Sequence, residues 1–180
     1  MIATLPMFPL ELVAFPGEEL PLHIFEQRYQ QLIEDCEEER VTFGIPTYMN
    51  KQLEYGTEME LLKVVKRYPT GACDIICRGL RVFKLVDFYN RLDNKLYAGG
   101  IVQFFNTTED GTETLRQQFI QLLTSFYKEL EIPTPAINVQ TINTYTLSHK
   151  IGLTVGQEYE LLQISSERER YEYLLSLIHI

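Results

Sequence analysis

The amino-acid sequence predicts an α+β protein, with a β-rich lobe first and an all-α helical lobe after it. Up to about residue 105 the chain consists of short segments rich in β-branched and aromatic residues. After about residue 112, apolar residues recur at helical spacing instead. The polar stretch 106–111 separates the two patterns. We therefore expect a β-rich lobe with one helix over residues 1–108, and a helical lobe over residues 112–180.

The opening segment is predicted to be extended. Pro6, Pro9, Pro16 and Pro21 are incompatible with a helix interior and suit edge-like strands. Pro16 is followed by Gly17, a pair that is typical of turns.

One helix is expected next, over about residues 25–38. Its apolar residues recur at the spacing i, i+4, i+7, i+8 and i+11, which places them on one helix face. The acidic block 34–39 is interpreted as the solvated end of this helix. The apolar face consists of Phe25, Tyr29, Leu32, Ile33 and Cys36.

Five strand candidates follow, separated by the turn signals Tyr55-Gly56, Pro69-Thr70-Gly71 and Asp93-Asn94. Residues 82–86 alternate less cleanly than a sheet with one exposed face requires. A closed or nearly closed barrel, with both faces partly covered, fits such a series better. The candidates are residues 41–48, 58–68, 72–78, 80–89 and 97–105.

The last third of the chain reads as helices. A helical stripe over residues 115–130 is ended by Pro133 and Pro135. A further helix is expected around residues 136–150. Thr154-x-x-Gln157 and Ser166-x-x-Glu169 match the capping box, in which two side chains bind the free amide groups of a helix start. The side chains expected in the core of this lobe are Leu115, Phe119, Leu123, Phe126, Tyr159, Leu162, Leu174 and Ile178.

Charge and cysteine content restrict the class of protein. The formal net charge of −9 and the lack of any basic run longer than Lys66-Arg67 argue against nucleic-acid binding, because phosphate contacts need clustered cations. Three cysteines do not suggest a disulfide framework. We expect reduced thiols in a cytoplasmic protein. No signal peptide or membrane-spanning apolar run is expected.

Catalytic, cofactor and metal motifs are missing from the sequence. No glycine is followed by lysine, which excludes a phosphate-binding Walker A loop, and no nucleophile elbow or zinc helix occurs. Ser148-His149-Lys150 combines nucleophile and base types, but neighbours on a helix point in different directions. His23 and Glu26 are too few ligands for a metal. We expect no catalytic, metal or cofactor residues.

The opening of the chain, one later strand and the closing helices resemble the amino-terminal, substrate-recognising domain of the Lon protease. That family opens with Leu-Pro and Phe-Pro-Leu, continues with a Phe-Pro-Gly turn, and reaches Arg-Tyr through Leu-His-Ile-Phe-Glu. A glycine, arginine and aromatic strand and the closing helices are similar too. The matching segments are Leu5-Pro6-Met7-Phe8-Pro9-Leu10, Val13-Ala14-Phe15-Pro16-Gly17, Leu20-Pro21-Leu22-His23-Ile24-Phe25-Glu26-Gln27-Arg28-Tyr29, Gly79-Leu80-Arg81-Val82-Phe83, Gln157-Glu158-Tyr159-Glu160-Leu161-Leu162 and Arg170-Tyr171.

The resemblance implies a PUA-like pseudobarrel, a fold also found in RNA-binding domains, followed by a helical lobe. In full-length proteases this domain precedes an ATPase module and a serine–lysine protease module, recognises substrates and supports hexamer assembly. We expect a stand-alone bacterial member that ends before either module and is not an enzyme. Its expected partners are unfolded or damaged polypeptides, with a separate ATP-dependent protease or another protein as a collaborator.

Two functional hypotheses remain open. The first is a non-catalytic peptide- or protein-binding module linked to protein quality control, and the alternative is an RNA-binding PUA-like protein. For the first, outward-facing aromatics on the strands are the candidate contacts, because adjacent strand residues point to opposite faces. Burial beneath helices is the competing outcome for these side chains. The candidates are Tyr48, Tyr68, Phe88, Tyr89, Phe104 and Phe105.

Overall fold

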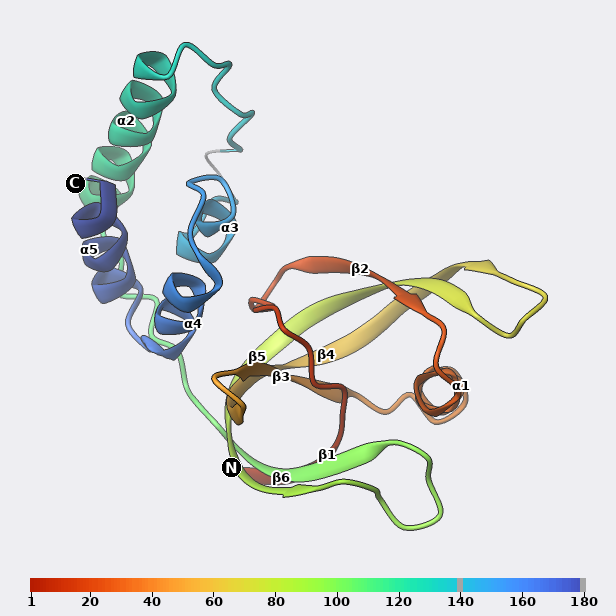
Figure 1. Ribbon diagram of the computed structural model, residues 1–180. Coiled ribbons are helices and arrows are strands. Elements are labelled where there is room, and N and C mark those ends of the chain that lie inside the picture. The colour runs from red at the N-terminus through yellow and green to blue at the C-terminus, as the bar shows by residue number, and fades with distance from the viewer. Residues whose placement is uncertain (139–140, 179–180) are drawn as a thin grey trace. The chain divides into compact units, whose positions relative to one another are not determined.

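A computed structural model describes residues 1–138 and 141–178 of the chain (Figure 1). It divides into two compact units, Met1–Phe105 and Asn106–Ile180. Strands and one helix form the first unit, and helices form the second, so the predicted α+β class is confirmed.

The first unit is a barrel with an extension. Its elements are β1 (Ile2–Met7), β2 (Glu19–Ile24), α1 (Gln27–Glu39), β3 (Phe43–Met49), β4 (Gln52–Arg67), β5 (Cys73–Tyr89) and β6 (Ala98–Phe104). The sheet order is β2-β5-β4-β3-β1-β6, and β5 also pairs with β6. Five strands therefore close a ring, as predicted, while β2 pairs with β5 outside it. Only the β1–β3 pairing is parallel among the named strands.

Strand β5 is one continuous element of 17 residues, so the prediction of two strands, 72–78 and 80–89, was wrong. The sequence reading placed a break at Gly79, but the glycine serves a close backbone approach instead. A Cβ at Gly79 would lie 2.1 Å from the carbonyl oxygen of Phe15. The Gly79 amide donates to the Glu18 carbonyl at 3.0 Å, and the Gly17 amide donates to the Gly79 carbonyl at 2.8 Å.

Strand β4 also begins earlier than predicted, at Gln52 instead of residue 58. The pair Tyr55-Gly56 suggested a turn, yet Gly56 lies inside the strand, opposite Pro46. A Cβ on Gly56 would be 2.4 Å from the Ile45 carbonyl oxygen, so this glycine too permits close packing. The β3–β4 turn is made by Asn50 and Lys51, whose φ angles of 52° and 60° suit a type I′ hairpin.

Beyond the barrel, β2, β5 and β4 continue as a three-stranded extension, here called the arm. Pairing of β3 with β4 ends at Phe43 and Met59, and Met59 pairs with Gly79. From Arg78 onwards towards the hairpin turn, β5 pairs with β2 on one side and with the segment Glu60–Arg67 of β4 on the other. Figure 1 shows this hairpin in yellow, extending away from the barrel.

Helix α1 covers one face of the arm. Tyr29, Leu32, Ile33 and Cys36 are buried on it, as predicted, and pack in one core cluster with side chains of β2, β4 and β5. Phe25, by contrast, precedes the helix and is 66% exposed, so its assignment to the apolar face was wrong. The helix begins two residues later, at Gln27, which removes Phe25 from the i, i+4 series.

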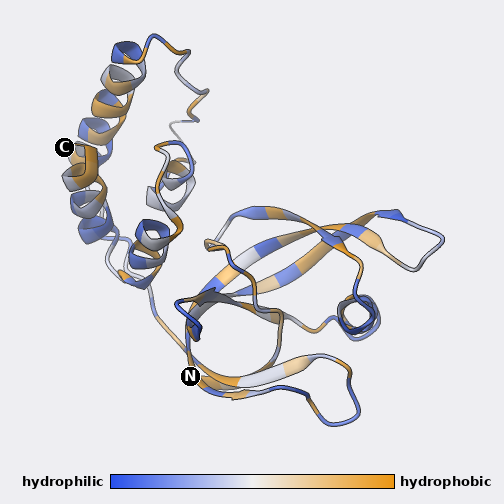
Figure 2. Ribbon diagram, in the orientation of Figure 1, coloured by the Kyte–Doolittle hydropathy of each residue, from blue (hydrophilic) through white to orange (hydrophobic). Residues whose placement is uncertain are grey.

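The second unit consists, among the described residues, of α2 (Glu113–Glu129), α3 (Thr144–Ser148), α4 (Val155–Gln163) and α5 (Glu167–Ile178). Both α2 and α3 pack against α5. Figure 2 shows apolar and polar residues interleaved along α2, as an amphipathic helix requires. Phe119, Leu123, Leu162 and Leu174 are buried as predicted, while the other predicted core side chains of this unit are half-buried: Leu115, Phe126, Tyr159 and Ile178.

The helix expected around residues 136–150 is limited to Thr144–Ser148. Residues 136–138 and 141–143 are not helical, and residues 139–140 lie outside the described residues. The helix starts where it does because Asn143 and Thr146 form a capping box that the sequence reading missed. None of the described helices is both long and apolar enough to cross a membrane.

Of the two predicted capping boxes, the one at Thr154 is complete, and the one at Ser166 is shown in its serine half. Thr154 and Gln157 form the full capping box at the start of α4. The Ser166 side-chain oxygen accepts the Glu169 amide, and its hydroxyl donates to the Asp110 carboxylate, which ties the start of α5 to the linker before α2.

Truncating Phe119 to Ala should destabilise the protein. The side chain is fully buried and lies against Tyr171, so the substitution loses apolar burial and leaves a cavity. A loss of about 3–5 kcal/mol is expected in urea unfolding monitored by circular dichroism. An unchanged unfolding midpoint would contradict the placement of α2 against α5.

Gly79→Ala should destabilise the protein by about 1–3 kcal/mol or more, because the added methyl group meets backbone that cannot rotate away. Gly156→Ala is the matched control. A Cβ there meets nothing closer than 3.8 Å, and alanine favours the helix, so the control should be neutral or stabilising by up to about 1 kcal/mol. Thermal unfolding of both variants measures the difference, and equal melting temperatures would argue against the Gly79 contact.

Candidate functional site

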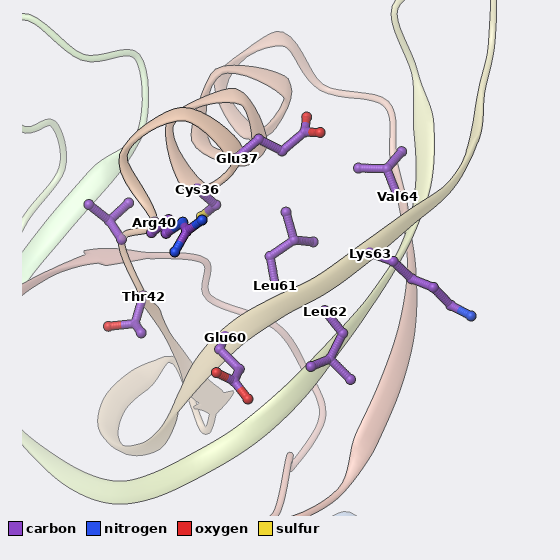
Figure 3. Close-up of a pocket in the computed structure, with 10 residues that line it drawn as sticks. Cys36, Glu37, Arg40, Thr42, Glu60, Leu61, Leu62, Lys63 and Val64 are labelled. Atoms are coloured by element: carbon purple, nitrogen blue, oxygen red, sulfur yellow. The ribbon is translucent and has the colours of Figure 1, made fainter.

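A hollow in the first unit lies between α1 and the arm segment of β4. It has a volume of about 420 Å³ and is called the groove below. Figure 3 shows Leu61 pointing from β4 towards α1, and Cys36 lying on the helix side that faces the strand. The groove is lined by Cys36, Glu37, Arg40, Val41, Thr42, Glu60, Leu61, Leu62, Lys63 and Val64.

The groove exists because β3 and β4 separate at this point. Arg40 adopts a left-handed conformation, with φ of 54°, and ends α1, and two residues then lead into β3. Pairing with β4 therefore starts only at Phe43. Within residues 1–138 and 141–178, no strand pairs with this edge of Glu60–Arg67. Because alternate residues of an antiparallel strand direct their amide and carbonyl groups to each edge, this stretch presents backbone donors and acceptors to the groove.

The floor of the groove is apolar. Leu61 and Val64 are half-buried and pack against the core cluster beneath α1. Cys36 is buried beside them, and burial, reinforced by the neighbouring Asp35 carboxylate, raises the pKa of its thiol to about 12. At neutral pH this thiol is protonated, so it contributes a small apolar surface instead of a nucleophile.

The rim of the groove carries two compensated and two uncompensated charges. The Glu37 carboxylate accepts two hydrogen bonds from Arg67, at 2.6 and 2.7 Å, and these bonds raise the pKa of Arg67. Glu60 is paired with Arg78.

The remaining rim charges, Arg40 and Lys63, have no ion-pair partner in the part of the chain that the structure describes. Thr42 is held by a hydrogen bond to Glu58, which is itself paired with Arg81. The uncompensated charge at the rim is therefore positive, although the whole chain carries −9.

The structure places the six predicted aromatic contacts in different environments. Phe104 is buried in the barrel core beneath the Arg81 guanidinium, which lies 3.7 Å from the ring centroid. Phe88 is half-buried and packs against the same core cluster. Phe105 faces the other way and stacks on Tyr55, with 5.8 Å between ring centroids.

Of the other three, Tyr48 is 42% exposed at the end of β3, and Tyr89 is 39% exposed at the end of β5. Tyr68 is half-buried at the end of β4. Tyr48 pairs with Leu53 near the start of β4, so it lies up to roughly 50 Å from Tyr68 along the strand, at about 3.3 Å per residue. The structure therefore does not bring the six aromatics together in one groove.

Tyr68 belongs to a small surface cluster at the tip of the arm. Its hydroxyl donates to Asp74 at 2.6 Å, and the His23 ring contacts the same carboxylate at 2.6 Å. These two hydrogen bonds hold the pKa of Asp74 below its usual value. The exposed Phe25 ring stacks on His23. Glu26 pairs with Arg28, so the expected neighbours His23 and Glu26 have separate partners.

The Ser148-His149-Lys150 cluster is dispersed. The Ser148 hydroxyl donates to the Tyr145 carbonyl inside the unit, the His149 ring pairs with Glu158, and the Lys150 amine donates to the Ala136 carbonyl. The three side chains therefore point to separate partners. No group of three or more metal-ligand side chains occurs among the described residues.

Sequence reasoning missed the groove itself. Its lining residues form no motif, because the site consists of a strand edge that lacks a neighbour. The signal that could have indicated it is a mismatch of lengths, since β4 has 16 residues and its partner β3 has seven. The turn expected at Gly56 shortened the predicted strand to residues 58–68 and so concealed that mismatch.

Known proteins support the architecture. Among solved structures, the Lon N-terminal domain protein from Xanthomonas campestris is 29% identical, with a TM-score of 0.73 over 97% of this chain and 98% of that chain. The N-terminal domain of the Mycobacterium avium complex Lon protease is 17% identical and shares the fold, with a TM-score of 0.70 over 98% of each chain. No curated protein matches. The family model of the ATP-dependent protease La (LON) substrate-binding domain matches residues 4–179, and the chain therefore belongs to that family.

Proposed function

We propose that this protein is a non-catalytic module that binds extended segments of unfolded or damaged polypeptides in protein quality control. The observation that carries the proposal is the groove, in which an unpaired strand edge runs along an apolar floor. Membership of a substrate-binding domain family supports the same role. We place the protein in the cytoplasm, where its three free, buried thiols stay reduced.

The chemistry of the groove favours unfolded over folded partners. A folded protein has paired nearly all of its backbone amide and carbonyl groups and buried most of its large apolar side chains. An unfolded segment exposes both. A strand edge with an apolar floor can bind both features at once, since backbone pairing supplies affinity and side-chain contacts supply selectivity.

The same residues argue for binding without chemistry. The described thiols are buried, and burial raises the pKa of both Cys36 and Cys77 to about 12. Ser148 is buried and bonded to backbone. A partner, such as a separate ATP-dependent protease, would therefore have to act on the bound polypeptide.

We keep five of the six aromatic candidates as proposed secondary contacts outside the groove. These are the exposed Tyr48 and Tyr89 and the half-buried Tyr68, Phe88 and Phe105. Phe104 would act only through the barrel core in which it is buried. The RNA-binding alternative is less favoured, because the net charge of −9 repels phosphate and the groove offers only two uncompensated cations among its lining residues.

Purified protein should bind a permanently unfolded polypeptide, such as reduced and carboxymethylated α-lactalbumin, and should not bind the native form. The physical reason is that only the unfolded chain offers free backbone and apolar side chains together. Fluorescence anisotropy measures the binding of the labelled unfolded and native forms. Incubation with ATP or casein should give no turnover, because no described side-chain cluster can support either reaction.

Three results would contradict the proposal. These are equal binding of native and unfolded forms, steady cleavage of casein, and salt-sensitive binding of a mixed RNA pool that is tighter than the binding of the unfolded polypeptide.

A further inference from the structure

Resting on the function proposed above, we infer that the groove binds its polypeptide by strand addition to Glu60–Val64, and that it selects segments in which acidic residues accompany apolar ones. The occupant is a short extended segment of an unfolded chain. It takes the place that β3 would occupy if its pairing with β4 continued past Phe43.

The backbone geometry provides the pairing partner. Residues Glu60–Val64 are already in strand conformation and are held on their other edge by β5. This edge is therefore already ordered before the polypeptide binds, and this lowers the entropic cost of binding. The five residues span about 16 Å at roughly 3.3 Å per residue, so the bound segment is about five residues long.

The two faces of an added strand meet different surroundings. Its residues on the α1 side contact the apolar floor formed by Leu61, Val64 and Cys36 (Figure 3). Residues on the opposite side lie beside Lys63, whose side chain points away from α1 in the same view. Because strand side chains alternate between faces, the preferred segment alternates apolar and acidic residues. Arg40, beside Thr42, is positioned for a further carboxylate at the end of the segment.

Local charge outweighs the net charge of the chain at this site. The carboxylates of the rim are neutralised by Arg67 and Arg78, whereas Arg40 and Lys63 lack counterions within the described residues. Glu34, Glu38 and Glu39 of α1 do not line the groove, and their repulsion of an acidic segment is screened over about 8 Å at physiological ionic strength. Contacts within the groove are shorter than that length, so the two cations dominate.

The same features limit unwanted pairing. Register shifts occur between Leu61 and Lys63 and between Val64 and Lys66, and each shift bends the edge. Lysines and bulges on an edge discourage long, flat ladders between copies of a protein. A segment of about five residues with acidic side chains still fits, because it is shorter than such a ladder and pairs with the lysine.

The test uses the full chain and three kinds of labelled 12-residue peptide. One alternates Val or Leu with Glu, and the second carries Lys in place of Glu. The third kind is the Glu peptide with N-methyl groups on either the odd or the even residues. Residues of one parity direct their amides to one edge, so one N-methylated peptide should lose binding and the other should retain it.

The Glu peptide should bind at least about tenfold more tightly than the Lys peptide. The variant Arg40→Glu/Lys63→Glu should abolish or reverse that preference. The matched control is Lys51→Glu/Lys128→Glu, which makes the same change of charge outside the groove and should leave the preference intact. Circular dichroism and thermal unfolding confirm that both variants fold.

Equal affinity for the Glu and Lys peptides would overturn the inference, as would an unchanged preference in the groove variant or equal binding of both N-methylated peptides. If the protein binds unfolded α-lactalbumin while these tests fail, the proposed function stands and the binding mode is wrong. If neither the peptides nor unfolded α-lactalbumin bind, the proposed function itself fails.

Discussion

The backbone contact between Gly79 and the turn at Phe15–Gly17 is the constraint on which the first unit depends. It lies where β5 exchanges one neighbour for another, with β2 paired as far as Arg78 and β6 paired from Phe83 onwards. Any side chain at residue 79 would separate the two backbones, because a Cβ there would lie 2.1 Å from the Phe15 carbonyl oxygen. The contact therefore allows one long strand to serve both the closed barrel and the arm.

The groove arises at the same place, where the barrel ends and the arm begins. Met59 of β4 pairs with Gly79, and it is also the last residue of β4 to pair with β3. After Met59, β4 remains paired with β5 on one edge and lacks a strand on the other edge, within the described residues. Helix α1 buries the face of the arm but leaves that edge beside an apolar floor. A fold that closes the barrel with five strands and extends two of them thus creates a place for an added strand.

Much of the fold could be predicted from the sequence, because it is determined by patterns among residues that are close together in the chain. The period of α2, the Thr154–Gln157 cap and the separation of strands from helices at 106–111 each depend on neighbouring residues. What could not be predicted depends on contacts between distant residues. Gly56 was assigned to a turn and Gly79 to a break between two strands, because their close backbone partners, Ile45 and Phe15, are far away in the sequence. The groove was missed for the same reason, since a missing neighbour leaves no motif. The aromatic candidates were chosen by side-chain type, which does not distinguish the buried Phe104 from the exposed Tyr48.

Hydrogen–deuterium exchange of the backbone amides, with and without a saturating acidic–apolar peptide, tests the account most directly. Amides of an unpaired edge exchange faster than amides inside a barrel, because exchange reports local opening and solvent exposure. The account predicts that the peptide slows exchange within Glu60–Val64, while the β5–β6 ladder between Phe83 and Tyr89 changes little. Protection confined to other segments, with exchange at Glu60–Val64 unchanged, would contradict strand addition at this edge.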